Sequence, residues 1–435
     1  MNYYNDMLAC VQKAITFDCV QQPPQNDMPF GENINNCLEY TLDVAKNLGF
    51  TTVNKKYYGY AEIGSGELFG ILGHLDTVPF NNSGWKFPAL SAIIDNGILY
   101  GRGVLDNKGP IIACLFAVKE LSLTYLPTKK IRIIFGCNEE SGWKCMDKYV
   151  ENEEMPAVGF SPDGDFPVIN CEKGIVYFDV EIEKPNNLIN ICGGERPNVV
   201  MSEATATLSA ITEQEQTELL ALGGSINGNK VTFFGKSAHG SCPHLGINAF
   251  YKMLSAFSQV FGDGYTFLLQ KLATNDGSGL NVNLQDAKSG ATTCNVGLVS
   301  LQNNKLHFSL DIRYPISYTK ELVQNRIQGA LPDAKLQITM FHNPLYIAPD
   351  DALCTKLLTA YNNVMQTNAK PISIGGGTYA RVLPKGVAFG PIFPNTESTI
   401  HQANECVKLT DFEKMYKIYL EAIKNLCFSP TKAKP

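Results

Sequence analysis

The chain has 435 residues, of which 44% are hydrophobic and 18% are charged, and its formal net charge is -6. This length exceeds one compact core and predicts two domains, and the composition is typical of a soluble globular protein. The weakly acidic charge is spread along the chain, so it offers no electrostatic basis for binding nucleic acid or an anionic membrane.

Two further features bear on the compartment in which the chain works. The N-terminus, Met1-Asn-Tyr-Tyr-Asn-Asp, lacks the basic region and apolar core of a signal peptide, and no apolar run approaches the length of a membrane span. The 13 cysteines form no C-x-x-C pair, which favours free buried thiols over a zinc knuckle. We therefore expect a cytoplasmic protein that does not cross a membrane.

The first part of the chain predicts two helices followed by two strands. Their expected ranges are 4–20 and 34–48 for the helices and 57–63 and 68–72 for the strands. Gly64-Ser-Gly66 between the strands indicates a hairpin. His74 and Asp76 follow the second strand, and residues two apart in a strand face the same way. Asp76 can therefore reach the ring nitrogen of His74 that a metal ion does not use.

Acidic residues then stand at the ends of successive elements. The expected elements are a helix over 108–121 and strands over 131–137 and 157–160. Asp106 comes before the helix, Glu139 and Glu140 follow the first strand, and Asp163 follows the second. Because parallel α/β sheets gather ligands at the carboxyl ends of their strands, these side chains are expected to converge. Adjacent acids project to different sides, so Glu139 and Glu140 can serve two purposes.

From Gly174 the pattern changes: apolar residues alternate with polar ones over 176–183, and they alternate strictly over 305–314. Such alternation indicates an antiparallel sheet with one wet face and helices on the other. After about residue 340 the α/β pattern returns, with helices over 351–367 and 409–426 and a strand over 387–389. We predict a discontinuous α/β catalytic domain, residues 1–173 and 341–435, and an inserted α+β domain, residues 174–340.

Two imidazoles and three carboxylates occupy turns or strand ends of the outer segments. They are His74, Asp106, Glu140, Asp163 and His401. This set suits a pair of divalent ions such as zinc, cobalt or manganese, with one carboxylate bridging the two. Taken alone, an Asp at a strand-to-helix turn is commonly an N-cap. Five residues in five matching contexts favour the metal site, whereas His342 stands alone and is assigned a structural role.

Six motifs, in order, resemble the di-zinc peptidase family that includes aminoacylase, carnosinase and peptidase V. They are Gly73-His-Leu-Asp76, Tyr100-Gly-Arg-Gly-Val-Leu-Asp106-Asn-Lys-Gly-Pro110, Asn138-Glu-Glu140, Ser161-Pro-Asp163, Gly235-Lys-Ser-Ala-His239-Gly240 and His401-Gln-Ala-Asn-Glu405. The resemblance implies a di-metal exopeptidase-type domain with a mainly parallel mixed sheet, and a lid formed by the inserted domain. Within this family, the chain is most similar to peptidase V-type dipeptidases.

The resemblance also implies roles for individual residues. His74, Asp106 and Asp163 would hold one ion, Glu140 and His401 the other, with Asp106 bridging. Asp76 would orient His74, and Glu139 would be the general base. A cis peptide is implied between Asp106 and Asn107, and Asn107 is a departure because many relatives have Asp there.

Three residues of the inserted domain are candidates for binding the substrate. His239 would donate to the oxyanion, Arg313 could clamp a substrate carboxylate or pair with Asp311, and Asn198 is a further candidate. We expect a metallodipeptidase that holds two divalent ions, zinc in preference to manganese or cobalt, and acts as a monomer on small peptides. The alternatives are an N-acyl-amino-acid amidohydrolase and a non-catalytic binding protein, and the presence of Glu139 with all five ligands argues against the latter.

Overall fold

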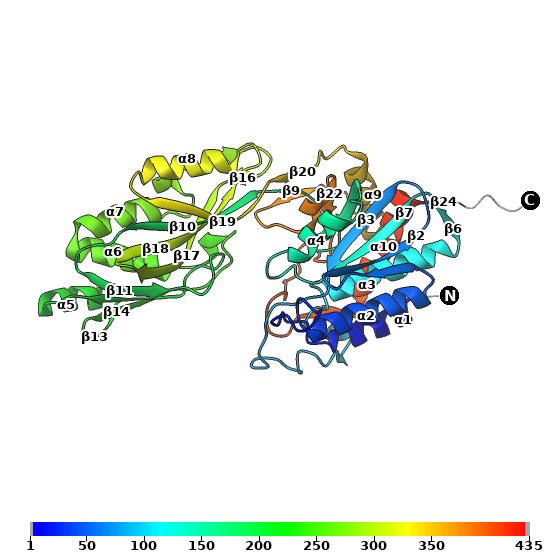
Figure 1. Cartoon of the computed structure of the whole chain (residues 1–435), viewed down its shortest axis with the longest axis horizontal. Coiled ribbons are helices and arrows are strands. Elements are labelled where there is room, and N and C mark those ends of the chain that lie inside the picture. The colour runs from blue at the N-terminus through cyan, green and yellow to red at the C-terminus, as the bar shows by residue number, and fades with distance from the viewer. Residues whose placement is uncertain (1–2, 431–435) are drawn as a thin grey trace, which may run out of the picture. The chain divides into compact units, whose positions relative to one another are not determined.

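The computed structural model describes residues 3–430, and contacts along the chain divide them into two compact units (Figure 1). The first comprises the residues up to Asn170, Ile347–Ile372 and the residues from Thr378 onward. The second comprises Cys171–Tyr346 and Ser373–Gly377. The sequence-based limits of 174–340 for an inserted domain stay a prediction. Within residues 3–430, no helix has both the length and the apolarity that a membrane crossing requires.

The main sheet of the first unit is mixed, and its centre is parallel. Its order is β1 (Thr51–Asn54), β2 (Tyr58–Ile63), β7 (Lys130–Gly136), β3 (Leu68–His74), β8 (Val158–Ser161), β22 (Gly386–Ala388) and β9 (Ile169–Glu172). Strands β20 (Leu345–Tyr346) and β21 (Ile372–Ile374) also pair with β9, and their residues belong wholly or mostly to the second unit. Strands β7, β3, β8 and β22 run parallel. The predicted mainly parallel mixed sheet is confirmed.

The predicted hairpin between β2 and β3 is wrong. Strand β7 lies between them, antiparallel to β2 and parallel to β3. Gly64 and Gly66 both have positive φ and do reverse the chain. A turn residue sets a local reversal only, and a strand from a later part of the sequence can still enter the space between the two arms.

Helices pack on this sheet and on one another. They are α1 (Tyr4–Ile15), α2 (Glu32–Asn47), α3 (Lys108–Ser122), α4 (Lys144–Asn152), α9 (Ala352–Met365) and α10 (Leu409–Cys427), with the 3₁₀ turn η3 (Tyr379–Val382). All but three residues of α3 are buried, since it packs on α1, α10 and β3. The predicted extension of the first helix to residue 20 is wrong, because Cys19 and Val20 bond instead with Thr77 beside the end of β3.

Small sheets complete the first unit. One joins β23 (Cys406–Lys408), β5 (Ile98–Tyr100) and β4 (Ile94–Asp95), and another joins β24 (Phe428–Pro430) and β6 (Tyr125–Pro127). In the first of these, Cys406 pairs with Tyr100, so the chain after His401 runs beside the chain before Asp106.

The second unit is an eight-stranded antiparallel sheet. Its order is β13 (Ser225–Asn227), β14 (Lys230–Phe234), β12 (Glu203–Leu208), β11 (Leu188–Gly193), β17 (Thr293–Gln302), β18 (Lys305–Tyr314), β10 (Gly174–Glu183) and β19 (Lys335–His342). The predicted strand range of 305–314 agrees with β18, and the alternation predicted over 176–183 lies within β10. The alternating pattern therefore identified the central strands correctly.

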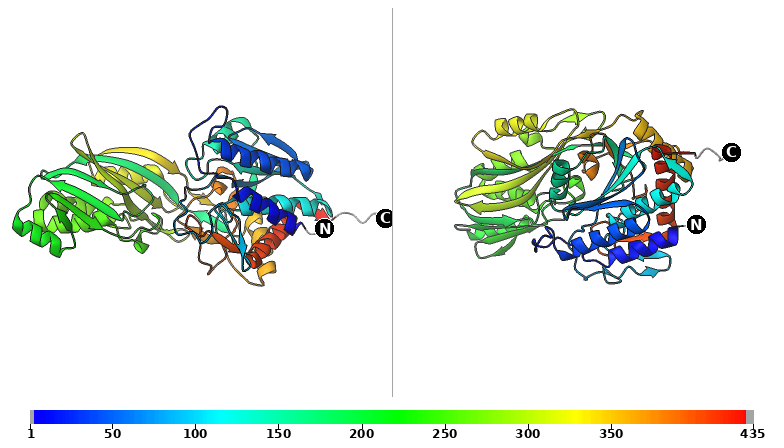
Figure 2. Two further views of the ribbon diagram at one scale, coloured as in Figure 1. Left: turned by 90° about the horizontal axis from the view of Figure 1, so that it is seen from below. Right: turned by 45° about the vertical axis from the view of Figure 1, so that its right-hand side comes forward.

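Four helices contribute to the apolar core on this sheet, and Figure 2 shows helices of this green and yellow part of the chain beside its strands. They are α5 (Glu213–Ala221), α6 (Ala249–Phe261), α7 (Asp263–Leu272) and α8 (Lys320–Ala330). Two 3₁₀ turns, η1 (Pro243–Leu245) and η2 (Ser278–Leu280), and a hairpin of β15 (Gln285–Asp286) and β16 (Gly290–Ala291) complete the unit. Val176, Phe178 and Val180 of β10 point into the shared core, as the alternation predicts.

Candidate metal centre

The centre lies where three adjacent parallel strands of the first unit end. His74 is the last residue of β3, Glu139 and Glu140 follow β7, and Asp163 follows β8. Because β7, β3 and β8 are neighbours and run parallel, their carboxyl ends meet at one edge of the sheet. The expected convergence of these side chains is therefore a consequence of the strand order.

The structure brings the five predicted ligands together as two overlapping sets. His74 Nε2 lies 2.9 Å from Asp106 Oδ1 and 3.6 Å from Asp163 Oδ2. His401 Nε2 lies 2.8 Å from Asp106 Oδ2 and 3.2 Å from Glu140 Oε2. Within each set one ligand atom per residue lies within 4.8 Å of the others. The two oxygens of Asp106 thus face different imidazoles.

The residues fit a pair of divalent cations by their chemistry. Imidazole nitrogens and carboxylate oxygens are ligands that zinc and its neighbours accept. Glu140 Oε1 is buried and has no hydrogen-bond partner among residues 3–430. A buried carboxylate oxygen without a donor is costly unless a cation compensates it. Asp106, with one oxygen toward each histidine, has the geometry of a bridging ligand.

The electrostatics of the cluster are those of crowded acids. Burial, and then the negative charge of Asp106, raise the pKa of Glu140 to about 7. Burial also raises the pKa of Glu139 well above its ordinary value. Although burial opposes it, hydrogen bonds to Asp106 and Glu140 raise the pKa of His401 to about 11. The cluster therefore favours positive charge, whether it is carried by protons or by metal ions.

Asp76 makes the predicted contact with His74 and others besides. The Nδ1 atom of His74 faces the backbone oxygen of Asp76 at 3.0 Å, and the nearest carboxylate oxygen lies at 3.5 Å. The two carboxylate oxygens accept the backbone N–H groups of Glu139 and Glu140, each at 3.0 Å. The backbone oxygen and the carboxylate of Asp76 therefore both lie near His74 Nδ1, and the carboxylate also holds the Glu139-Glu140 turn.

Asn107 connects two of the strand ends, which the sequence did not indicate. Its Oδ1 accepts from the backbone N of His74 at 3.3 Å, and its Nδ2 donates to the backbone O of Pro162 at 2.6 Å. A Cβ at Gly73 would stand 2.3 Å from Oδ1, so the close approach requires glycine there. The peptide bond between Asp106 and Asn107 is cis, as the resemblance implies.

Four residues near the centre had no role predicted from the sequence. The ring of Tyr379 lies edge-on to that of His74, with 6.1 Å between their centroids, and its hydroxyl lies 2.8 Å from the sulfur of Cys145. Arg102 and Glu405 form a buried ion pair of 2.7 Å beside Asp106. Glu405 belongs to the motif that begins at His401, and this was the one signal that could have drawn attention to it.

The three predicted substrate residues lie in the second unit, near one loop. His239 is exposed, and its Nδ1 lies 2.7 Å from Ser241 Oγ. The backbone N of Gly240 donates to the O of Asn198 at 2.7 Å. A Cβ at Gly240 would stand 2.3 Å from Asp311 Oδ2, so Asp311 lies directly beneath this loop.

Arg313 is buried and bonded to Asp311. Its Nε and Nη2 donate to the two carboxylate oxygens of Asp311 at 2.6 and 2.9 Å, Nη2 also donates to Tyr177 Oη, and Nη1 donates to Gly375 O. Four of the five guanidinium N–H groups are thereby engaged. Of the two possibilities left open by the sequence, the pairing with Asp311 is present.

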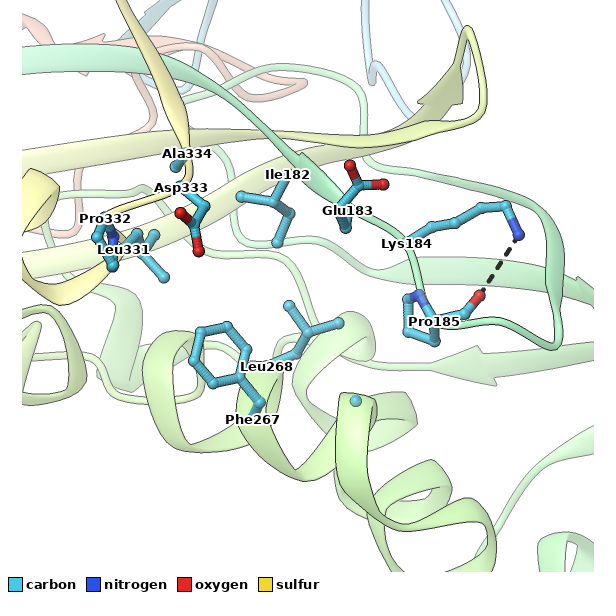
Figure 3. A pocket seen from close by; sticks show the side chains of 11 residues that line it. Ile182, Glu183, Lys184, Pro185, Phe267, Leu268, Leu331, Pro332, Asp333 and Ala334 are labelled. Atoms are coloured by element: carbon cyan, nitrogen blue, oxygen red, sulfur yellow. Dashed lines mark hydrogen bonds between the residues drawn. The ribbon is translucent and has the colours of Figure 1, made fainter.

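The second unit also has a hollow of about 300 Å³ between α7, the end of β10 and the loop before β19 (Figure 3). Apolar side chains such as Ile182, Phe267 and Leu268 line it, and Glu183 and Asp333 stand at its sides. None of the predicted site residues contributes to its wall.

The chain is similar to known proteins over nearly its whole length. A family model described as Peptidase family M20/M25/M40 matches residues 70–425. YtjP of Bacillus subtilis, named as a candidate dipeptidase, is 33% identical over 428 residues, which are 92% of each chain. An M20 family metallo-carboxypeptidase of Sulfolobus solfataricus aligns with a TM-score of 0.60 at 17% identity, covering 98% of this chain and 99% of that one. Human carnosine dipeptidase 1 aligns with a TM-score of 0.58 at 14% identity, covering 98% and 96%.

Proposed function

We propose that this chain, which belongs to peptidase family M20/M25/M40, hydrolyses the amide bond of dipeptides with the help of two divalent metal ions. The observation that carries the proposal is the Asp106 carboxylate, with one oxygen 2.9 Å from His74 and the other 2.8 Å from His401. The choice of dipeptides is supported by the similarity to YtjP over nearly the whole length of both chains.

The proposed ligand assignment follows the two sets. His74, Asp106 and Asp163 would hold one ion, and Asp106, Glu140 and His401 would hold the other. Zinc is the proposed metal, since nitrogen and carboxylate ligands suit it, and cobalt or manganese accept the same set. When bound, such a pair of ions supplies Lewis acidity, which polarises a carbonyl and lowers the pKa of a coordinated water.

Glu139 is proposed to move the protons. It follows Asn138 at the end of β7, next to the ligand Glu140, yet it belongs to neither ligand set. Burial raises the pKa of its carboxyl, which makes the carboxylate a stronger base than an exposed glutamate. It accepts a proton from the attacking water and then delivers it to the leaving amine.

Residues of the second unit are proposed to act on the substrate. His239, exposed on its loop, donates to the carbonyl oxygen as charge develops there. Asn198 and Arg313 act at the carboxylate end of the substrate. Because Asp311, Tyr177 and Gly375 engage four N–H groups of Arg313, we propose that it contributes mainly a fixed positive charge rather than a two-pronged clamp.

A substrate panel on metal-loaded protein tests this function. The panel contains one dipeptide, the tripeptide extended from it and the N-acetyl derivative of its C-terminal residue, each incubated with protein reconstituted with zinc, cobalt or manganese. The proposal expects the dipeptide to have the highest kcat/KM. Preference for the N-acetyl amino acid would assign the chain as an amidohydrolase instead, and turnover of none would point to a binding protein.

A further inference from the structure

Glu405 is a buried anion that contacts no predicted ligand side chain. Its side chain is fully buried, and its two oxygens meet four donors. Oε2 accepts from Arg102 Nη1 at 2.7 Å and from Gly103 N at 3.0 Å, and Oε1 accepts from Leu105 N at 2.9 Å and from Asp106 N at 3.3 Å. The carboxylate thus replaces the hydrogen bonds that this irregular loop cannot make to itself.

The same two chain segments are bonded at further points. Gly101 N donates to the backbone O of Glu405 at 2.9 Å, and Arg102 Nη2 donates to the O of Gln402 at 3.2 Å. Strand β23 begins directly after Glu405 and pairs with β5. The 101–106 loop and the 401–405 turn therefore form one hydrogen-bonded body, although about 300 residues separate them in the sequence.

This body carries Asp106 at one end and His401 at the other. The backbone of His401 has φ 63°, a left-handed conformation that costs a non-glycine residue free energy and needs surrounding structure to maintain it. By contrast, His74 ends the buried strand β3, and Asp163 follows β8, so both are held by the main sheet. Glu140 also follows a strand of this sheet, β7. His401, which belongs to the second set alone, is therefore the ligand of that set that depends on the 401–405 turn for its position.

We infer that Glu405 is a positioning residue for the second metal subsite: by binding Arg102 and the backbone of 103–106, it sets the distance between Asp106 and His401. This inference rests on the proposed ligand assignment and extends it. Loss of the carboxylate should weaken the subsite of Asp106, Glu140 and His401 more than that of His74, Asp106 and Asp163. Replacement of an outer partner of a metal ligand typically costs 10–100-fold in metal affinity.

The test is a Co²⁺ titration of metal-free protein, followed by visible absorption and by metal content after gel filtration. It compares the wild-type protein, Glu405→Gln and the control Glu413→Gln, which removes a half-exposed carboxylate of α10. Wild-type and control should bind two ions with similar affinity. Glu405→Gln should keep one ion near wild-type affinity and bind the second about 10–100-fold more weakly, with Glu405→Asp, which keeps the anion, lying between them.

Several outcomes separate this inference from the proposed function. Circular dichroism of the metal-free variants establishes whether they fold. If Glu405→Gln does not fold, Glu405→Asp decides the question: the inference requires that its affinity for the second ion alone is reduced. Two ions bound as in wild-type, or equal weakening of both subsites, would overturn the inference. Two ions in the wild-type protein without dipeptide hydrolysis would contradict the proposed function, while the binding comparison would still decide the role of Glu405.

Discussion

At the scale of residues, the site depends on side chains whose two polar ends meet different partners. Asp106 faces an imidazole with each oxygen, Asp76 holds two consecutive backbone N–H groups, and Asn107 accepts from His74 and donates to Pro162. Each of these residues fixes the distance between two segments. Their replacement should therefore change geometry as well as charge.

The role of Glu139 can be isolated by Glu139→Gln, which keeps the shape and removes the base. Turnover of a dipeptide should fall by about 10²–10⁴-fold, the typical contribution of a general base. Metal content should stay at two ions per chain, since Glu139 is in neither ligand set. Steady-state kinetics and metal analysis check this. Retention of most of the activity would show that another group moves the proton.

The proposed role of the Arg313 charge can be tested by changing the substrate instead of the protein. Replacement of Arg313 would leave Asp311 buried without its partner, so the substrate is changed instead. A dipeptide amide lacks the terminal carboxylate, and its kcat/KM should fall at least tenfold relative to the free dipeptide. Equal kcat/KM values for the dipeptide and its amide would show that Arg313 does not recognise the substrate carboxylate.

At the scale of elements, close packing between β3 and the start of α3 brings the first ligand set together. Gly73 lets Asn107 approach the backbone of His74, and Ile111 of α3 packs against the same point. A side chain at this position would push α3 and the preceding loop away from the strand, and Asp106 lies in that loop.

Gly73→Ala should therefore destabilise the metal-free protein by about 1–3 kcal/mol, because its Cβ would stand 2.3 Å from Asn107 Oδ1. Metal affinity should fall as well. Gly329→Ala in α8 is the matched control, since a Cβ there meets no atom within 4 Å, and it should be neutral or stabilising by up to about 1 kcal/mol. Urea unfolding compares them, and identical midpoints for both variants would disprove the close-approach explanation.

At the scale of the whole molecule, the candidate residues are divided between the two units. The metal ligands and Glu139 belong to the first, and His239, Asn198 and Arg313 belong to the second. The second unit is as large as a domain by itself, with an eight-stranded sheet and its own apolar core. This size is consistent with a lid that serves the active site of its own chain.

We therefore predict that the active species is a monomer. Light scattering coupled to gel filtration should give a mass near 47.8 kDa for the fraction that hydrolyses dipeptides. As a second check, mixing the inactive variants Glu139→Gln and His239→Ala should restore no activity, because each chain would need both residues. Activity confined to a dimer, or recovered on mixing, would show that His239 acts on a neighbouring chain.

The sequence by itself determined the parts of the site that depend on local pattern. Apolar runs ending in His74, Glu139-Glu140 and Asp163 located the strand ends, and parallel strands bring such ends together. Alternation between 305 and 314 located a central strand of the second unit. These predictions succeeded because periodicity and strand termini are properties of a short stretch of chain.

Only the tertiary structure decided the contacts between distant segments. It placed β7 between β2 and β3, turned the Asp76 carboxylate to the backbone after β7, and joined Glu405 to the loop before Asp106. A buried carboxylate or guanidinium binds whichever donors or acceptors the fold brings within reach. That choice depends on the packing of the whole chain, and no local pattern of residues records it.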